Sequence, residues 1–184
     1  MTRASAIILN ALGLYALALI LAAAFAAQLL LHELPCPLCL LQRIQFTALA
    51  IGPILNIRFG PRPSHYALSL LAAVAGAAFS TRQILLHILP GDAGYGSALL
   101  GYHYYTWALI GFAAAILLLA AVLLFDRQFV DSAAPPAAPG AFARIAVWLV
   151  IALTAANAGS ALLECGFGAC ADDPSVYELL KRAT

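Results

Sequence analysis

The chain has 184 residues, of which 64% are hydrophobic and only 9% are charged. Soluble domains average about 45–50% hydrophobic and about 25% charged residues, so the composition excludes an ordinary soluble domain. One soluble core of this size could not hide so much apolar surface, and lipid must therefore solvate most of it. The net charge is +1 without any cluster of Lys and Arg, so no nucleic-acid partner is expected.

Apolar runs long enough to cross a membrane, which takes about 20 residues per helix, occur along the whole chain. They predict spans over residues 5–31, 40–57, 66–89, 105–125 and 142–163, with a Pro/Ala-rich loop at 133–141 and a tail at 164–184. We therefore expect an all-α, polytopic membrane helix bundle that forms a single domain over residues 1–184.

The arginines of the short loops indicate the orientation, because cytoplasmic flanks of spans are enriched in Lys and Arg. One side of the five-span arrangement carries Arg3, Arg58, Arg62, Arg127 and Arg144. The other side carries Glu33, Asp92, Glu164, Asp172, Asp173 and Glu178, with Lys181 and Arg182 at the extreme tail. The N-terminus is predicted to be cytoplasmic and the C-terminus outside. A cleaved signal peptide is the alternative for the first span, but its apolar run is too long for one.

All four cysteines fall on the outer side of this arrangement. Cys36 and Cys39 lie at the outer end of the second span, and Cys165 and Cys170 follow the outer end of the fifth. Outside a bacterial inner membrane the compartment is oxidising, so the two pairs are interpreted first as disulfides.

The segment Cys36-Pro37-Leu38-Cys39 is a C-x-x-C motif, which forms a readily exchanged disulfide and lowers the pKa of one thiol. Cys39 is expected near the first turn of the second helix, where free N–H groups and the helix dipole stabilise a thiolate. Pro37 suits the first helical position because it has no N–H to leave unpaired. A passive structural disulfide, or a pair of ordinary buried thiols, is the alternative.

Arg43 follows Cys39 by four residues, so both lie on one helix face about 6 Å apart along the axis. A guanidinium at this depth needs an anionic or polar partner, such as the Cys39 thiolate or the carbonyl oxygen of a quinone. The alternative is an arginine whose side chain extends to the outer interface.

The second pair encloses a short loop with two glycines, Cys165-Gly166-Phe167-Gly168-Ala169-Cys170. Mobility of this loop would let the pair meet a soluble partner and then the first pair. A static disulfide is the alternative. In the tail that follows, Asp173 and Pro174 predict the start of a short helix.

The run from Cys36 to Arg43, Cys-Pro-Leu-Cys-Leu-Leu-Gln-Arg, resembles the signature of the disulfide bond formation protein B family. These proteins are quinone reductases of the bacterial inner membrane that reoxidise a periplasmic, thioredoxin-like thiol oxidase. The resemblance implies a four-helix core around the first pair, to which this chain adds a fifth helix. It also implies that ubiquinone or menaquinone from the membrane pool binds beside Cys39 and Arg43.

The second pair departs from the family pattern. In the family it lies in the outer loop between the third and fourth spans, whereas the corresponding loop here, residues 90–105, contains no cysteine. This difference leaves the thiol partner and the order of exchange open. By family order alone, Cys165 would face the partner and Cys170 would attack Cys36.

The expected chemistry is a relay of electrons from an outer thiol protein through both pairs to quinone. The candidate catalytic residues are Cys36, Cys39, Cys165 and Cys170, and the candidate quinone contacts are Arg43, Gln42, Arg82 and His87, with His103 behind them. Arg82 is expected to have a partner within the bundle. Gly76, Ser80, Asn157, Gly159 and Ser160 are interpreted as sites of close helix packing.

Two other classes of function compete with this prediction. Four thiols together with His32 or His103 could bind zinc or copper, although an oxidising compartment opposes this, and no metal is predicted. The chain could also be a non-enzymatic membrane subunit in which both pairs are structural.

Overall fold

A computed structural model describes residues 1–129 and 139–181. Most of the Pro/Ala-rich loop predicted at 133–141, and Arg182 in the tail, lie outside the described residues.

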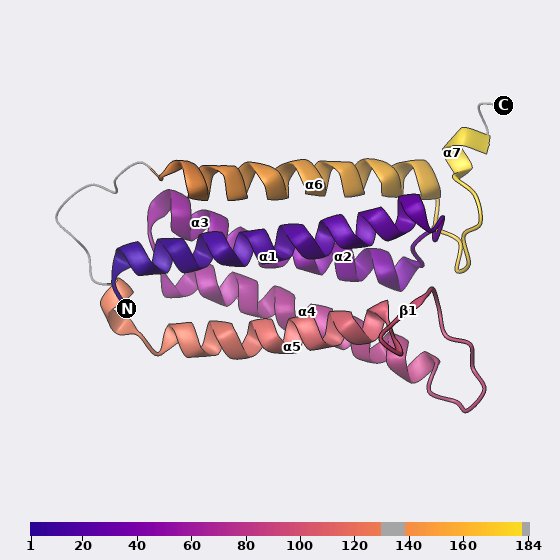
Figure 1. Ribbon diagram of the computed structural model, residues 1–184, viewed down its shortest axis with the longest axis horizontal. Coiled ribbons are helices and arrows are strands. Elements are labelled where there is room, and N and C mark those ends of the chain that lie inside the picture. Colours follow the sequence, from indigo (N-terminus) through magenta and orange to yellow (C-terminus); the bar gives the residue numbers. More distant parts are fainter. Residues whose placement is uncertain (130–138, 182–184) are drawn as a thin grey trace.

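The described chain is almost entirely helical (Figure 1). The long helices are α1 (Arg3–Leu30), α2 (Pro37–Leu49), α3 (Ile51–Phe59), α4 (Pro63–Leu86), α5 (Tyr104–Leu123) and α6 (Ala141–Cys165). The short elements are β1 (Ala98–Leu99), β2 (Tyr102–His103), the 3-10 helix η1 (Asp126–Phe129) and α7 (Glu178–Lys181).

Among the described residues, five helical segments are long and apolar enough to cross a membrane, which confirms the predicted all-α membrane bundle. They are α1, the segment Pro37–Phe59 formed by α2 and α3, α4, α5 and α6. Each predicted boundary lies within 3 residues of the helix end in the structure. The short tail helix differs from the prediction, because it begins at Glu178 and not at Pro174.

Proline and glycine set several of these helix ends. Pro37 and Pro63 occupy the first turns of α2 and α4, where a missing N–H costs nothing. Gly60 ends α3 with φ of 90° and Gly166 ends α6 with φ of 65°, a backbone region that favours glycine.

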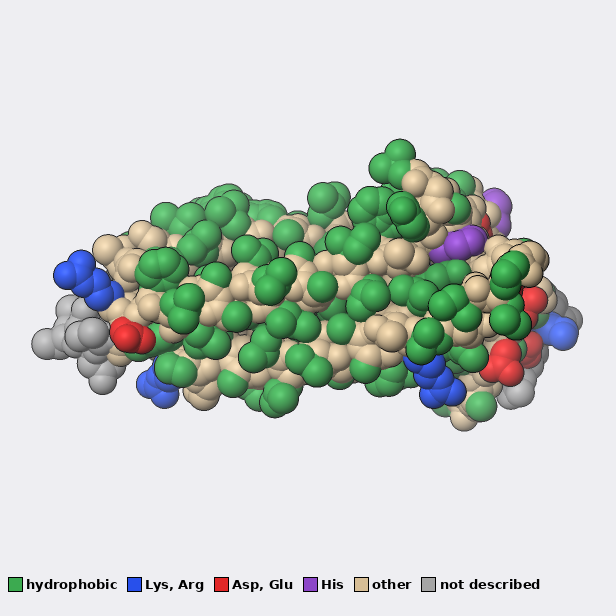
Figure 2. Space-filling view, turned by 90° about the horizontal axis from the view of Figure 1, so that it is seen from below, with side chains coloured by type: hydrophobic (Ala, Val, Ile, Leu, Met, Phe, Trp, Pro, Cys, Tyr) green, Lys and Arg blue, Asp and Glu red, His purple; other side chains and the backbone are tan. Residues whose placement is uncertain are grey.

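The long helices run along one axis and pack as a bundle (Figure 1). The main contacts join α4 to α5, α1 to α6, and α2 to α4. At the centre, the rings of Phe46 and Phe112 stack with their centroids 4.0 Å apart. Phe112 is fully buried and its ring lies against Gly76 of α4. Hydrophobic side chains cover the length of the molecule, while the histidines and most of the acidic side chains visible in this view lie toward one end (Figure 2).

The loop between α4 and α5 folds over the cysteine end of the bundle. Tyr95 Oη donates a hydrogen bond of 2.7 Å to the carbonyl oxygen of Leu34. Ser97 hydrogen-bonds Glu33, which also lies between α1 and α2. These contacts fix the loop against the corner that precedes the first cysteine pair.

Candidate functional site

The first cysteine pair is a disulfide at the start of α2, with its Cα atoms 5.0 Å apart. Cys36 is the N-cap residue, and the backbone N–H of Cys39 donates to Cys36 Sγ over 3.2 Å. Cys39 therefore lies in the first turn of the helix, as predicted, with the positive end of the helix dipole beside its sulfur. Cys36 is only 6% exposed.

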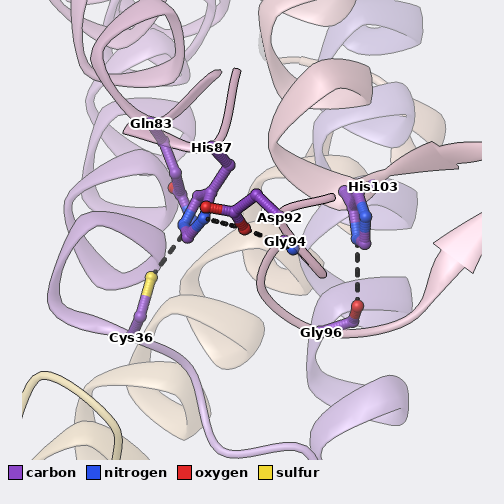
Figure 3. Close-up of polar contacts among 7 residues, drawn as sticks. All are labelled: Cys36, Gln83, His87, Asp92, Gly94, Gly96 and His103. Carbon is purple, nitrogen blue, oxygen red and sulfur yellow. Dashed lines mark hydrogen bonds and ion pairs between the residues drawn. The ribbon is translucent and has the colours of Figure 1, made fainter. Parts of the chain in front are cut away.

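Gln83 of α4 holds both sulfur atoms of this pair. Its Nε2 lies 3.2 Å from Cys36 Sγ and 3.4 Å from Cys39 Sγ, and the contact to Cys36 is drawn in Figure 3. Gln42 fixes the Gln83 amide by donating to its Oε1 over 2.9 Å. Both glutamines are buried. Gln83 was not among the site residues predicted from the sequence. Gln42, which was, supports the sulfur atoms indirectly by its hydrogen bond to Gln83.

Arg43 is held by polar groups from two other helices. Its Nη1 donates to Gln28 Oε1 over 2.7 Å and to Asn157 Oδ1 over 3.2 Å, and its Nη2 donates to the carbonyl oxygen of Ala24 over 2.9 Å. Gln28 in turn donates to Ser160 Oγ over 2.6 Å. The side chain thus points into the bundle and does not extend to the interface.

Asn157 and Ser160 therefore do more than permit close helix packing, which corrects the sequence interpretation. Asn157 accepts a hydrogen bond from Arg43, and Ser160 accepts one from Gln28. The interpretation of Gly76 as a packing site is confirmed by its contact with Phe112.

A cavity of about 470 Å³ lies beside Cys39 and Arg43. Its walls come from α1, α2, α5 and the loop over the cysteine end, and they are mostly apolar. Glu33, Cys39, Gln42, Arg43 and Tyr95 supply polar groups to the lining, and Phe46, Trp107 and Ala108 are among its apolar residues. Because α1 and α5 both line the cavity but make few contacts with each other, the cavity lies at a seam between these helices.

Tyr95 closes the cavity on the side of the loop. Burial raises the pKa of Tyr95 to about 12, and the carboxylates of Asp173, Glu164 and Glu33 contribute in the same direction. The phenol therefore stays neutral and keeps its hydrogen bond to Leu34 at physiological pH.

Two of the predicted quinone contacts, Arg82 and His87, are not part of the cavity lining. Arg82 is exposed on the outside of α4, and its side chain makes no hydrogen bond or ion pair with any other residue in the described ranges. His87 bonds Asp92 Oδ1 over 3.0 Å (Figure 3), and its ring stacks on that of Tyr105. Hydrogen bonds from the N–H of Gly94 and from His87 lower the pKa of Asp92. These two hydrogen bonds hold Asp92 within the loop. His103 bonds the carbonyl oxygen of Gly96.

The second cysteine pair is also a disulfide, with its Cα atoms 4.5 Å apart. Cys165 is the last residue of α6, and the loop to Cys170 lies at the same end of the bundle as the start of α2 (Figure 1). Within this loop Phe167 is 88% exposed. The tail beyond is tied to α1, because Gln28 Nε2 donates to Tyr177 Oη over 3.1 Å.

Metal binding has no geometric support in the part of the chain that the structure describes. All four cysteines are joined in disulfides, and no three side chains of His, Cys, Asp or Glu converge among residues 1–129 and 139–181.

Comparisons with known proteins point to one family. A family model described as "Disulfide bond formation protein DsbB" matches residues 5–97. Disulfide bond formation protein B of Xanthomonas axonopodis pv. citri is 41% identical over 86 residues, which are 44% of this chain and 50% of that protein. Disulfide bond formation protein B 2 of Burkholderia lata is 38% identical over 91 residues, 49% of this chain and 54% of that protein.

The matched segment covers the first cysteine pair but not the second. The chain spans about half the length of the curated relatives it matches. The matched segment contains Cys36, Cys39, Arg43 and Gln83, but it ends before α6 and the second cysteine pair. No solved structure matches the chain.

Proposed function

We propose that this chain, which belongs to the disulfide bond formation protein DsbB family, is a membrane thiol:quinone oxidoreductase that sustains disulfide formation. The observation that carries the proposal is the cavity beside the first disulfide, which joins Cys39 and Arg43 in one mostly apolar wall. A sulfur atom with a cation beside it, facing an apolar space inside a membrane bundle, suits electron transfer to a lipid-soluble acceptor.

The residues around the cavity fit a quinone. The volume of about 470 Å³ falls within the range of small-molecule sites, about 300–1,000 Å³. A guanidinium has five N–H donors, and the three hydrogen bonds that Arg43 makes to described residues leave two for a carbonyl oxygen of a ligand. Phe46 and Trp107 offer aromatic surface to a planar ring. Ubiquinone or menaquinone, bound here, would accept two electrons and two protons.

The first pair is arranged to receive electrons at Cys36 and to release them at Cys39. A thiolate that bonds Cys36 Sγ breaks the Cys36–Cys39 bond, and the electron pair passes to Cys39 Sγ. The helix N-terminus and the Gln83 N–H then stabilise the Cys39 thiolate, which lines the cavity. Because Cys36 is buried, this attack requires the corner between α1 and α2 to open.

The second pair is proposed to pass electrons from an outer thiol protein to the first. A donor thiolate opens the Cys165–Cys170 bond, and a second donor thiolate resolves the mixed disulfide, which leaves two thiols on this chain. One of them attacks Cys36 and the other completes the exchange, so the second disulfide forms again and Cys36 and Cys39 are left reduced. By family order, Cys165 faces the partner and Cys170 meets Cys36.

The proposed partners are a periplasmic, thioredoxin-like thiol oxidase and the quinone pool of a bacterial inner membrane. In this arrangement the N-terminus is cytoplasmic and the C-terminus periplasmic. The exposed Phe167 and the surrounding glycines would present the second pair to a soluble protein.

Anaerobic mixing of the reduced, purified protein with a ubiquinone or a menaquinone analogue tests the proposal through the absorbance of each quinone. We expect rapid reduction of one of them by the native chain and none by Cys39→Ser. Replacing both Cys165 and Cys170 by Ser is the matched control. It is expected to abolish turnover with a protein thiol donor while a small dithiol, which reduces the first pair directly, still supports quinone reduction.

Unchanged turnover of the Cys39→Ser protein would refute the proposal. Slow, inaccessible thiols that quinone does not reoxidise would favour a membrane subunit with structural disulfides. Stoichiometric zinc or copper in the anaerobically purified protein would favour a metal-binding function.

A further inference from the structure

Glu164 is a buried carboxylate that the mechanism above does not use. It lies in the last turn of α6, directly before Cys165, and it is only 2% exposed. Neither of its carboxylate oxygens accepts a hydrogen bond from any residue in the described ranges. An ionised carboxylate in such a place is costly, because burial removes water and no donor replaces it.

The charged and titratable groups around Glu164 come from three elements. Arg43 of α2, Tyr177 of the tail and Tyr95 of the loop over the cavity are electrostatically coupled within this cluster. The helix α1 contributes the neutral amide of Gln28. Arg43 and Tyr95 both line the cavity, so Glu164, which is not part of the lining, interacts electrostatically with two residues of its wall.

Glu164 is not a fixed ion-pair partner of Arg43. The guanidinium directs its hydrogen bonds among the described residues to Gln28, Asn157 and the carbonyl oxygen of Ala24. The carboxylate is therefore close enough to interact electrostatically with Arg43 but has no hydrogen bond that holds its proton state constant. A group in this situation can gain and lose a proton as the charge beside Arg43 changes.

Reduction of a quinone in the cavity needs a proton source, and the residues that line the cavity supply protons poorly. Arg43 keeps its protons at any relevant pH, and the pKa of Tyr95, about 12, makes its phenol a weak acid. Glu33 hydrogen-bonds Ser97 in the covering loop. Glu33 itself lines the cavity, but its carboxylate accepts that hydrogen bond, whereas Glu164 is buried, accepts none from the described residues and interacts with Arg43.

We propose that Glu164 carries a proton in the resting protein and delivers it to the Arg43 side of the cavity during quinone reduction. This inference rests on the proposed function. Closing the Cys36–Cys39 bond from two thiols releases two electrons and two protons, and the conversion of a quinone to a quinol consumes both. Glu164 passes on one of these protons and regains it from the thiols of the second pair or from water at the outer face.

Infrared spectroscopy of the quinone-free protein tests the resting state without any activity measurement. At neutral pH we expect the carbonyl band of a protonated carboxylic acid, which Glu164→Gln removes. Glu33→Gln is the matched control, because it neutralises another carboxylate near the cavity, and it is expected to leave the band unchanged. Absence of the band from the native protein would overturn the inference.

Steady-state kinetics test the proton delivery. With a small dithiol as donor, Glu164→Gln is expected to lower kcat by about 10²-fold, a typical contribution of general acid catalysis, with KM for the quinone analogue unchanged. Glu164→Asp, which keeps the acid, is expected to restore most of the rate and serves as the second variant if Glu164→Gln does not fold. An effect on KM with kcat unchanged would instead make Glu164 a counter-charge for Arg43 and overturn the inference.

The two proposals fail in different ways. If the native protein does not reduce any quinone analogue, the proposed function fails, whereas the infrared test still decides the protonation of Glu164. If the native protein reduces quinone and Glu164→Gln does so at the same rate, only the inference fails.

Discussion

Arg43 is a cation that the fold stabilises inside a membrane bundle by combining groups from three helices. Its own helix α2 places it beside Cys39, α1 contributes Gln28 and a backbone carbonyl, and α6 contributes Asn157. Charged hydrogen bonds of this kind contribute about 1.5–3 kcal/mol each when their partners are already in place. The fifth spanning helix, which lies beyond the segment matched to the family, thus helps to position Arg43, a residue of the matched segment that lines the cavity.

The contribution of Tyr95 to stability can be tested by changing the pH. A raised pKa in the folded state means that its contribution to stability is fully present below the unfolded pKa, about 10, and is lost as the pH rises through about 12. Ionisation also removes the proton that Tyr95 donates to Leu34. We expect the native protein to lose thermal stability over this range and Tyr95→Phe to lose less, as measured by Tm in detergent at increasing pH.

A tyrosine on the same loop provides the control. Tyr102 is 58% exposed, and its replacement by Phe is expected to leave the alkaline loss of stability as it is in the native protein. Equal alkaline profiles for the native chain and Tyr95→Phe would contradict the role assigned to the Tyr95 hydroxyl.

At the scale of elements, the contact between α4 and α5 depends on a missing side chain. A Cβ atom at Gly76 would overlap the ring of Phe112, which is fully buried and stacked on Phe46. Gly76→Ala is therefore expected to destabilise the bundle by about 1–3 kcal/mol, the usual cost of overpacking a core. Unfolding in a denaturing detergent measures this effect.

Gly159 of α6 is the matched control, because a Cβ atom there would meet nothing within 4 Å. Gly159→Ala is expected to leave stability unchanged or to increase it slightly through better helix propensity. Combining Gly76→Ala with Phe112→Leu is expected to recover part of the loss. Equal unfolding free energies for Gly76→Ala and Gly159→Ala would contradict the close packing of α4 on α5 at Gly76.

The helices themselves could be predicted from the sequence because the signals are local. Apolar run length defines a span, and proline defines a helix start, so Pro37 placed Cys39 in the first turn of α2 correctly. The sequence did not predict which side of a helix faces the core. Arg82 and Gln83 are adjacent, yet Arg82 is exposed while Gln83 is buried against both sulfurs.

Most of the polar groups around the site escaped prediction for the same reason. Gln28 of α1 lies far in the sequence from Asn157 and Glu164 of α6, and groups from both helices reach Arg43 only because α1 and α6 pack together. A polar residue within an apolar run was the available signal, since such residues are costly without partners. That signal identified Arg43, but it does not tell which helix supplies the partner.

At the scale of the whole molecule, both disulfides lie at one end of the bundle and the arginine-bearing loops lie at the other (Figure 1). With cationic loops kept in the cytoplasm, both cysteine pairs would face the periplasm. After mild reduction of spheroplasts, we expect a membrane-impermeant maleimide to label the thiols of Cys165 and Cys170. The label is read as a mass increase of the purified chain.

A thiol at the opposite end completes this experiment. Arg62 is exposed in the turn before α4, and Arg62→Cys, in a chain without the other cysteines, is expected to react only after the membrane is permeabilised. Labelling of Cys170 and of the residue-62 thiol from the same side would contradict the topology and leave the proposed relay without a route.

The seam between α1 and α5 determines how a molecule reaches the cavity. The covering loop is fastened to Leu34 and Glu33 on the aqueous side, whereas the two helices scarcely touch beside the hydrocarbon. Entry through the lipid is thus the more open path, so occupancy would follow how strongly a compound partitions into the bilayer and not its concentration in water. Long-chain detergents used in purification would compete with such a compound for entry between α1 and α5.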